Sequence, residues 1–390
     1  MSSAGIDVRW QRRAADIDGE LWEACFPPSL EGEWWYRALE ASGLEDQFRF
    51  YYGVVCIAGE AVAIAPAFLM DLPIALVVPP AILPAFELLG RMFPSLRYQR
   101  SLFVGSPCAD EGRVGSLPGA DRQAILEALQ RALADLGREL GASMLVWKDF
   151  PTRDAAELEQ LARAAGLFVA VSFPGTVADL PGPGKQDYLA ALTRMRRHNL
   201  KKKLVRSAAT LALEVEVLQA PDELALDELF ALFSQTYAKA KTRFERLGRS
   251  FFSAIAAQPR SHFIVLRERS SRAMVAFMLC FALEDRVINK FIGIDYRRPN
   301  DAYLYFRLWE AALDWALARG ARSIQSGQTG YRAKLSLGHR LQPLTNYCRH
   351  RNPIVHWVYG RVARTIGWHT LDQDLAVHLQ AHPLDAAQRH

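Results

Sequence analysis

Cysteine is scarce in this sequence. The chain has five cysteines in 390 residues, and they are scattered, odd in number and free of any CxxC spacing. This pattern argues against a disulfide framework and a zinc site, so we expect no bound metal and a reducing compartment. The N-terminal segment MSSAGIDVRWQRRAADIDGE is polar and lacks an apolar core, which predicts a cytoplasmic protein without a signal peptide.

Several common catalytic fingerprints are missing. The sequence has no GxGxxG, no Walker loop, no HExxH and no GxSxG. Their absence removes most dehydrogenase, kinase, zinc-protease and α/β-hydrolase functions. A large excess of one charge is missing as well, because the net charge is +5. This mildly basic balance favours anionic partners but falls short of a dedicated nucleic-acid-binding protein, so we expect no DNA contact.

Long uninterrupted hydrophobic runs are also lacking. The most apolar stretch, Ala61 to Leu89, contains Asp71 and five prolines, whereas a membrane-spanning helix needs about 20 consecutive apolar residues. We expect a buried strand followed by an apolar loop. The alternative is a flap that faces a lipid or the acyl chain of a substrate.

What the sequence does contain is one pattern of elements that occurs twice. The first half predicts a hairpin, a helix ended by a glycine and a short strand, at Arg49–Ala58, Ala61–Met70, Arg122–Leu140, Gly141 and Ser143–Trp147. The second half predicts a hairpin, a third strand, a helix ended by a glycine and a short strand, at His262–Arg267, Ala273–Phe281, Arg286–Ile294, Tyr303–Ala318, Gly320 and Arg322–Ser326. Gly141 aligns with Gly320, which indicates two equivalent domains.

These elements predict an α+β fold in which each domain has a mixed, mostly antiparallel sheet with flanking helices. Pro181 to Gly184 punctuates the chain between the repeats. We therefore expect an N-terminal domain over residues 1–180, a C-terminal domain with the active site over 181–350, and a helical tail over 351–390. The tail segment Pro353–Ile366 is expected to pack on the second domain. The alternative is a membrane-surface helix, because Trp357 and Val358 accompany Arg361 and Arg364.

A basic segment, RMRRHNLKKKLVR at Arg194–Arg206, carries seven Lys or Arg residues and no acid. At helical spacing, Arg194, Arg197 and Lys201 share a face, while Met195 and several leucines gather on the other. One interpretation is a solvated basic helix. The other is a platform for phosphates of a cofactor, a nucleic-acid end or an anionic lipid.

A second segment, NKFIGIDYRRPNDAYLY, joins a strand to a helix. Asp301 is the expected N-cap of that helix, and Arg297 and Arg298 precede it. A helix N-terminus beside two arginines is typical of an anion-binding site. A capped helix with surface arginines explains the same residues. Asp295 and Tyr296 lie where the strand would open toward a cleft.

A third segment, SGQTGYRAKLSLG, follows a predicted buried strand. Gly327 and Gly330 permit a tight turn there. Gln328 adds a polar group, and Tyr331 and Lys334 would lie on one side of a helical turn. Such a polar turn more often marks a site than packing, although a purely structural turn is the alternative.

From Phe230 to Leu344 the chain resembles the GNAT-like acyltransferases of the FemAB/CelD-related group. The resemblance rests on the basic segment, on TYAKAKTRFERLGRSFF and on IGIDYRRPNDAYLYFRLWEAALDWALARGARSIQSGQTGYRAKLSLG followed by RLQPL. That group has a similar segment after its last helix and strand, which corresponds here to Gly330, Tyr331, Lys334 and Gly338. The repeat fits the tandem GNAT architecture of Fem-type enzymes.

The resemblance implies acyl or aminoacyl transfer to an amine, with the donor between Arg286–Ile294 and Arg322–Ser326. It implies catalytic roles for Tyr331, Lys334 and Asp295. Cofactor contacts would come from five residues, Arg297, Arg298, Gly327, Gln328 and Gly330. Substrate contacts would come from Arg194, Arg197, Lys201 and Tyr296. The usual pyrophosphate loop is not found at Arg297–Ala302, which weakens the case for a coenzyme A (CoA) ester.

Three functions from different classes remain. The first is an N-acyltransferase that uses acyl-CoA as a co-substrate and binds no cofactor permanently. The second is a Fem-type aminoacyltransferase that uses aminoacyl-tRNA; the basic helix suits it, although the sequence shows no long coiled-coil arm. The third is a noncatalytic binding protein. The expected partners are a small amine acceptor and the donor, with tRNA or anionic lipid contact and an inner-membrane-face location as alternatives.

Overall fold

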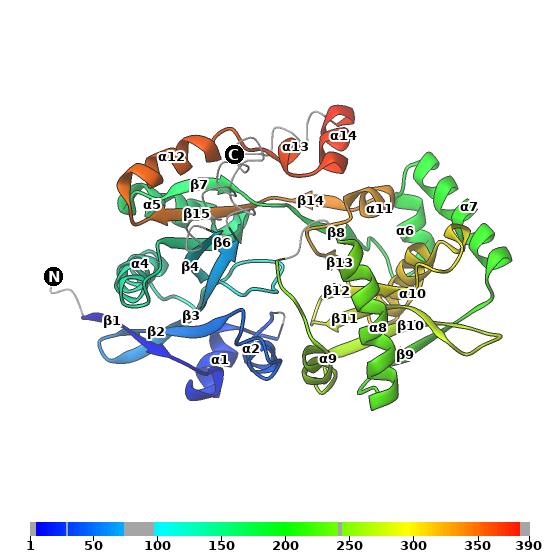
Figure 1. Ribbon diagram of the computed structural model, residues 1–390, viewed down its shortest axis with the longest axis horizontal. Coiled ribbons are helices and arrows are strands. Elements are labelled where there is room, and N and C mark those ends of the chain that lie inside the picture. Colours follow the sequence, from blue (N-terminus) through cyan, green and yellow to red (C-terminus); the bar gives the residue numbers. More distant parts are fainter. Residues whose placement is uncertain (1–4, 29, 74–96, 241–243, 383–390) are drawn as a thin grey trace. The chain divides into compact units, whose positions relative to one another are not determined.

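The computed structural model describes residues 5–28, 30–73, 97–240 and 244–382, which divide into two compact units (Figure 1). Unit 1 comprises Met1–Pro27, Glu45–Phe173 and Pro343–His390, and unit 2 comprises Pro28–Leu44 and Pro174–Gln342. Each unit has one mixed sheet with helices, so the predicted α+β fold with two equivalent domains is confirmed.

The sheet of unit 1 has the order β1-β2-β3-β4-β6-β15-β7, with β5 paired to β3. Its strands are β1 (Ile6–Gln11), β2 (Arg49–Ile57), β3 (Glu60–Pro73), β4 (Tyr98–Val104), β5 (Gly115–Ser116), β6 (Met144–Pro151), β7 (Phe168–Val171) and β15 (Leu344–His350). Its helices are α1 (Gly19–Cys25), α4 (Arg122–Glu139), α5 (Ala155–Ala165), α12 (Pro353–Ala363), α13 (Trp368–Leu371) and α14 (Gln373–Ala381), with short 3-10 turns at Ala14–Asp16 and Thr152–Asp154.

The sheet of unit 2 has the order β14-β8-β13-β12-β11-β10-β9. Its strands are β8 (Gly175–Asp179), β9 (Leu213–Leu218), β10 (Ser261–Glu268), β11 (Met274–Ala282), β12 (Arg286–Ile294), β13 (Ser323–Ser326) and β14 (Arg340–Gln342). Its helices are α2 (Glu33–Glu40), α6 (Lys185–Ala191), α7 (Arg194–Thr210), α8 (Glu223–Lys239), α9 (Arg249–Ala256), α10 (Leu304–Ala318) and α11 (Tyr331–Ser336), with a 3-10 turn at Asn300–Ala302.

The two units repeat one crossover. In unit 1, β4 and β6 are parallel and α4 connects them; in unit 2, β12 and β13 are parallel and α10 connects them. Apolar residues at helical spacing explain both connections. Leu126, Leu129 and Leu133 of α4 enter the core of unit 1, and Leu308 and Ala312 of α10 enter that of unit 2.

The domain boundaries differ from those predicted, 1–180, 181–350 and 351–390. Residues 28–44 were expected in the N-terminal domain but belong to unit 2. There the Trp35 ring is fully buried, and its centroid lies 5.6 Å from that of Phe281. The tail was expected on the second domain, but it packs on unit 1. There Gly360 lies against Phe168, and the buried Trp368 donates its indole N–H to the Ser172 carbonyl at 3.0 Å. Buried aromatic rings decide both placements, because they contribute the largest apolar areas.

Two further predictions concern single elements, the cap of α10 and the apolar stretch 61–89. Asp301 does not cap α10, which begins after Tyr303 without a side-chain cap; Asp301 instead pairs with Arg206 at 2.5 Å. The apolar stretch 61–89 begins as the buried strand β3, and its residues 74–89 lie outside the described part. No helix in the described part combines the length and the hydrophobicity needed to cross a membrane.

One histidine is buried in unit 2 without a polar partner among the described residues. His339 is 3% exposed, neither ring nitrogen has a hydrogen-bond partner, and the ring centroid lies 4.6 Å from that of Trp309. Burial, with a contribution from the Lys334 charge, holds the pKa of His339 well below its ordinary value of 6.5. The native state therefore keeps this imidazole neutral.

We expect the free energy of unfolding to fall as the pH drops below 6.5. In that range His339 becomes protonated in the unfolded chain but stays neutral in the native state. His339→Leu should reduce this dependence, since it removes the titrating group and leaves no polar atom unpaired. Urea unfolding at about pH 7 and pH 5 measures the effect. His262, whose pKa is also lowered by burial, should leave a residual slope. Equal slopes in the two proteins would contradict the assignment to His339.

Candidate active site

The strands β12 and β13 run side by side over a short distance and then part. Their pairing extends from Arg286 with Ser323 to Asn289 with Ser326, after which β13 ends and β12 continues to Ile294. Polar side chains gather at the end of the pairing. Asn289 and Ser326 are both buried, and the Asn289 amide lies 3.4 Å from the Ser326 hydroxyl. Buried polar side chains therefore lie where the predicted gap between the two strands begins.

A buried ion pair follows on the next residue of β12. The Lys290 side chain is 1% exposed, and its ammonium lies 2.8 Å from a carboxylate oxygen of Glu31. It also lies 5.0 Å from the ring centroid of Trp35. Because residues 28–44 belong to unit 2, this pair and the ring contact anchor that segment beside the strand opening. Sequence reasoning gave no signal for this pair.

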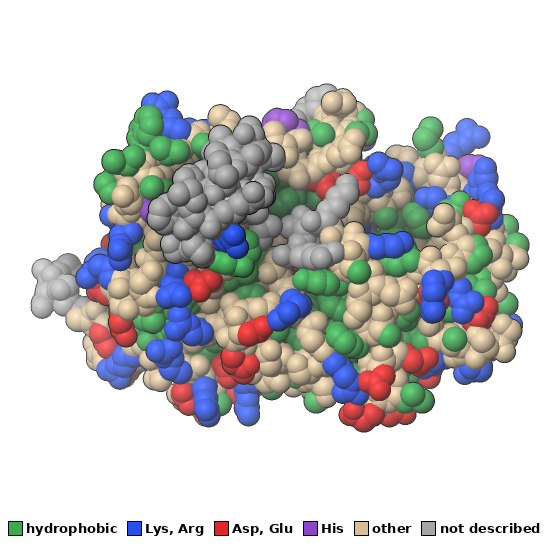
Figure 2. Space-filling model, viewed as in Figure 1, with side chains coloured by type: hydrophobic (Ala, Val, Ile, Leu, Met, Phe, Trp, Pro, Cys, Tyr) green, Lys and Arg blue, Asp and Glu red, His purple; other side chains and the backbone are tan. Residues whose placement is uncertain are grey.

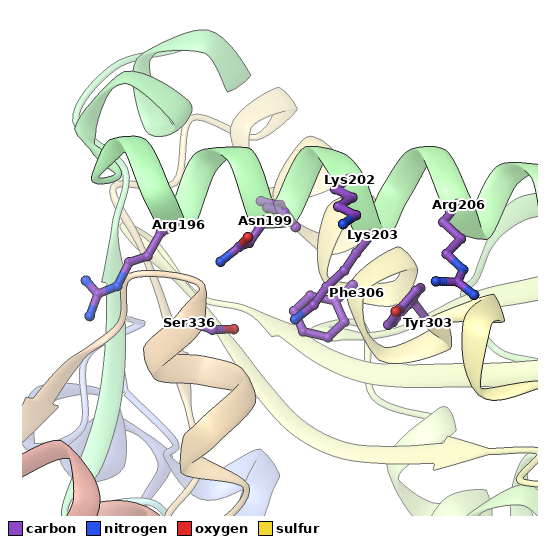
Figure 3. Close-up of a pocket in the computed structure, with 9 residues that line it drawn as sticks. Arg196, Asn199, Lys202, Lys203, Arg206, Tyr303, Phe306 and Ser336 are labelled. Atoms are coloured by element: carbon purple, nitrogen blue, oxygen red, sulfur yellow. The ribbon is translucent and has the colours of Figure 1, made fainter.

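A cavity of about 260 Å³ lies between α7, the start of α10 and α11 (Figure 3). Figure 3 shows Asn199 and Lys203 pointing from α7 toward Phe306 and Ser336. The cavity is lined by Arg196, Asn199, Leu200, Lys202, Lys203, Arg206, Tyr303, Phe306 and Ser336. Four of these are cationic and none is acidic, so the cavity favours an anion.

Local interactions hold α7 over this cavity. Thr193 caps the helix, because its hydroxyl accepts the Arg196 backbone N–H at 3.3 Å. Ser207 is fully buried and its hydroxyl donates to the Ala302 carbonyl, directly before α10. The Lys203 ammonium lies 3.7 Å from the ring centroid of Phe306. These contacts bring the basic residues to the N-terminal end of α10.

The electrostatics of the cavity suit a phosphate. The first N–H groups of an α-helix lack intrahelical acceptors and carry a partial positive charge, and no side chain caps α10. Burial lowers the pKa of the Lys203 ammonium, and a bound anion would offset that cost by favouring the charged form. The Arg206 charge is shared with Asp301 in a solvent-exposed pair, which screens it.

The predicted basic face of α7 is not the face that lines the cavity. Arg194 and Lys201 are exposed, and the Arg197 guanidinium donates to the Leu189 carbonyl at 3.2 Å. The lining residue Arg196 lies two positions from Arg194, which is about 200° around an α-helix. Met195, expected on the apolar face of the helix, is 74% exposed. The predicted basic helix is confirmed, and the substrate contacts predicted for Arg194, Arg197 and Lys201 stay predictions outside this cavity.

The basic turn before α10 is engaged with carboxylates. Asp295 is 3% exposed; its oxygens accept the Arg297 guanidinium at 2.8 and 3.1 Å, and Arg298 lies 3.3 Å away. Arg298 also pairs with Glu268 at 3.1 Å. The Arg297 hydrogen bond lowers the pKa of Asp295, which makes this carboxylate a weaker base. Tyr296 is 39% exposed, with the Lys239 ammonium 3.7 Å from its ring centroid.

The turn after β13 has the expected glycine geometry at one position. Gly330 has a φ of +70° and precedes α11, a backbone conformation that favours glycine. Tyr331 and Lys334 are buried; the Tyr331 hydroxyl donates to the Pro174 carbonyl at 2.9 Å, and the Lys334 ammonium donates to the Gly327 carbonyl. Ser336 is the residue of α11 that reaches the cavity, and sequence reasoning missed it.

The matching strand end in unit 1 is filled by the protein's own groups. Asp149 follows the parallel pairing of β4 with β6, is 3% exposed and has a φ of +59°. Its carboxylate accepts Lys148 and Ser172, and its backbone N–H donates to Asn346 at 2.7 Å. We therefore place the candidate site in unit 2. Among the described residues, no group of His, Cys, Asp or Glu side chains could hold a metal ion.

Solved structures similar to this chain include a tandem GNAT protein. FemX is 10% identical, with a TM-score of 0.56 over 90% of this chain and 100% of that one. A tandem GNAT protein from the clavulanic acid biosynthesis pathway is 13% identical, with a TM-score of 0.53 over 90% and 99%. L-PGS from Bacillus licheniformis is 13% identical, with a TM-score of 0.52 over 89% and 97%. Identities this low establish the fold, a tandem GNAT fold, and nothing finer.

The sequence assigns the family. A family model for FemAB-like proteins, described as peptidoglycan biosynthesis/recognition, matches residues 98–358. The chain therefore belongs to the FemAB-like family, as the sequence resemblance predicted. A comparison with curated proteins finds no match. The family and the fold together support a transferase of the aminoacyl or GNAT acyl type.

The catalytic roles of Tyr331, Lys334 and Asp295 stay predictions, and Tyr331 offers a clean test. Tyr331→Phe leaves the Pro174 carbonyl without its donor, which should lower stability by about 0.5–1.5 kcal/mol. If the Tyr331 hydroxyl only supports Pro174, the turnover of the variant, measured beside a thermal melt, should be unchanged. An unchanged melt with a roughly tenfold loss of turnover would instead establish the proton-donor role predicted from sequence. Lys334→Ala, tested in parallel, separates the two residues.

Arg297→Ala/Arg298→Ala tests whether the basic turn holds a ligand or a carboxylate. Buried Asp295 loses its cationic partners, so we expect a lower melting temperature at neutral pH and an unchanged donor affinity. Because the native pKa of Asp295 lies below its ordinary 3.8, the stability difference should disappear as the pH falls below that value. If a fully folded variant binds the donor more weakly, Arg297 and Arg298 contact the phosphate of the donor.

Proposed function

We propose that unit 2 transfers an acyl or aminoacyl group from an activated, phosphate-bearing donor to an amine. One observation carries this proposal. The cavity at the N-terminal end of α10 has four cationic side chains and no acidic one. It is formed in a tandem GNAT fold of the FemAB-like family. An uncapped helix end beside lysine and arginine side chains is a site for phosphate.

The size of the cavity limits what it holds. About 260 Å³ is below the roughly 300–1,000 Å³ of pockets that enclose a whole drug-sized ligand. The cavity therefore suits the phosphate end of a donor, and the remainder of the donor extends along unit 2. The acyl group would reach the opening between β12 and β13, where Asn289 and Ser326 are buried.

The strand opening supplies the remaining chemistry. Beyond Asn289, β12 has no pairing with β13. The Ile294 N–H at the end of this stretch already donates to the Thr236 hydroxyl at 3.1 Å, so an oxyanion would be stabilised by a backbone N–H between Asn289 and Ile294. The neutral amine nitrogen attacks the acyl carbonyl carbon and forms the new C–N bond. The C–S or C–O bond to the donor then breaks, and the ammonium proton passes to the leaving group or to solvent. Asp295, predicted from the sequence as the proton acceptor, is the alternative destination, although its hydrogen bonds from Arg297 weaken it as a base.

Acyl-CoA is the donor we propose first, because its diphosphate and phosphate groups match the cavity's charge. Aminoacyl-tRNA is the second candidate, and one feature favours it. The α7 helix has no acid along its 17 residues, and it carries exposed cations at Arg194 and Lys201 outside the cavity. A phosphate backbone would use both faces of such a helix, whereas a small cofactor uses one.

Two double variants of α7 test the site. Arg196→Ala/Lys203→Ala removes two charges that line the cavity, and Arg194→Ala/Lys201→Ala removes two from the exposed face. We expect the cavity variant to bind a CoA ester roughly 10- to 100-fold more weakly, the range for charged hydrogen bonds. The exposed-face variant should bind it normally. Calorimetry measures both, with thermal melts to confirm folding.

The same two variants distinguish the donors. A filter-binding assay with aminoacyl-tRNA should show weakening in both variants if tRNA is the donor, because both faces meet phosphates. If the cavity variant loses CoA-ester binding and the exposed-face variant keeps it, the donor is acyl-CoA. Wild-type protein that binds neither donor, or a cavity variant that binds both donors as well as the wild type does, would refute the proposed function.

A further inference from the structure

The helix α12 presents an apolar face to solvent. Ile354, Trp357 and Val358 are 73%, 61% and 41% exposed. They are spaced i, i+3 and i+4, so they form one continuous ridge along the helix. Figure 2 shows hydrophobic and basic side chains together over α12. A large exposed tryptophan between two aliphatic residues is unusual for a surface helix, and such patches often mark a binding surface.

The opposite face of α12 already packs on unit 1. Gly360 is buried against Phe168, and the His356 ring centroid lies 5.2 Å from that of Phe168. The Tyr359 and His350 ring centroids are 5.8 Å apart. These contacts fix the rotation of the helix, so the ridge of Ile354, Trp357 and Val358 has no place in the core of its own unit.

The surroundings of the ridge are strongly basic. Arg349, Arg351, Arg361 and Arg364 are all exposed, and the sequence has no Asp or Glu from residue 349 to residue 371. Among the described residues, none of the four is in an ion pair. Their partners are backbone carbonyls and a ring: Arg349 donates to Ala165, Arg364 donates to Gly360, and the Arg361 guanidinium lies 5.1 Å from the Trp357 ring centroid. Their charges are therefore available to an anionic partner.

We propose that the exposed face of α12 docks unit 1 on an anionic lipid bilayer. A ridge projects outward and suits insertion into a soft surface, whereas a protein ligand would need a complementary groove. Tryptophan beside arginine is the combination that lies at the boundary between headgroups and acyl chains. The apolar ridge would enter that boundary, and the exposed Arg351, Arg361 and Arg364 would contact lipid phosphates. The proposal does not depend on the function proposed for unit 2.

The chemistry of this surface sets the character of the binding. One short apolar ridge with a basic flank gives shallow, reversible attachment, far from the permanence of a spanning helix. Because arginine contacts with lipid phosphates are screened by salt, the binding should weaken as ionic strength rises. It should also require negatively charged lipid, since the ridge alone buries little area.

Vesicle flotation with the full chain tests the proposal. The vesicles contain either phosphatidylglycerol mixed with phosphatidylcholine or phosphatidylcholine alone. We expect wild-type protein to float with the anionic vesicles and to stay behind with the neutral ones. Raising the salt from about 0.05 to about 0.5 M should release most of it.

Three variants separate the contributions to binding. Ile354→Ser/Trp357→Ser should lower the bound fraction at least roughly tenfold, and Arg351→Gln/Arg361→Gln should lower it and flatten the salt dependence. Leu224→Ser, which changes an equally exposed leucine on α8 of unit 2, is the matched control and should bind as the wild type does. All four side chains changed on α12 and its flank are exposed, so the thermal melts should agree.

Two outcomes would overturn the proposal. The first is wild-type protein that stays behind with anionic vesicles. The second is an Ile354→Ser/Trp357→Ser variant that floats as well as the wild type, since the ridge would then have no part in binding. A protein that fails to float but binds a purified acidic protein through the same residues would assign this surface to a protein partner instead.

Discussion

The docking of α7 on the turn before α10 is the contact on which the candidate active site depends. Ser207 is fully buried, and its hydroxyl holds the Ala302 carbonyl. Asp301, which could have capped α10, is drawn to Arg206 instead. As a result α10 begins without a side-chain cap, and the cations of α7 lie over its first turn. One buried serine thus joins a positive helix to a positive helix end, an arrangement that favours a bound anion.

The elements themselves were predictable because their signals are local. The strand predicted over Arg286–Ile294 is β12 with the same limits. Gly141 and Gly320, predicted to end the two long helices, have φ values of +68° and +71°. A glycine in the left-handed region ends a helix wherever the rest of the chain lies. Hydrophobic periodicity and glycine position therefore sufficed for the helix, glycine and strand that both halves repeat. Sequence reasoning missed β4, the parallel partner of β6.

The site was less predictable because its geometry depends on distant residues. The face that α7 turns inward is decided by Ala302, about a hundred positions further along the chain, and by Phe306. The helix itself has few apolar residues to indicate that face, and Met195, expected on the apolar face, is exposed. The buried pair of Lys290 with Glu31 joins segments that are even further apart. No periodicity within either segment could indicate that they meet.

The position of β15 has a consequence for how the chain is made. This strand lies between β6 and β7 in the sheet of unit 1, yet it follows all of unit 2 in the sequence. A ribosome therefore releases every residue of unit 2 before it releases Leu344 to His350. Until β15 has been synthesised, the backbone donors and acceptors of β6 and β7 that face it have no strand partner. Unit 2 can complete its own sheet first, and the N-terminal unit of this protein finishes folding last.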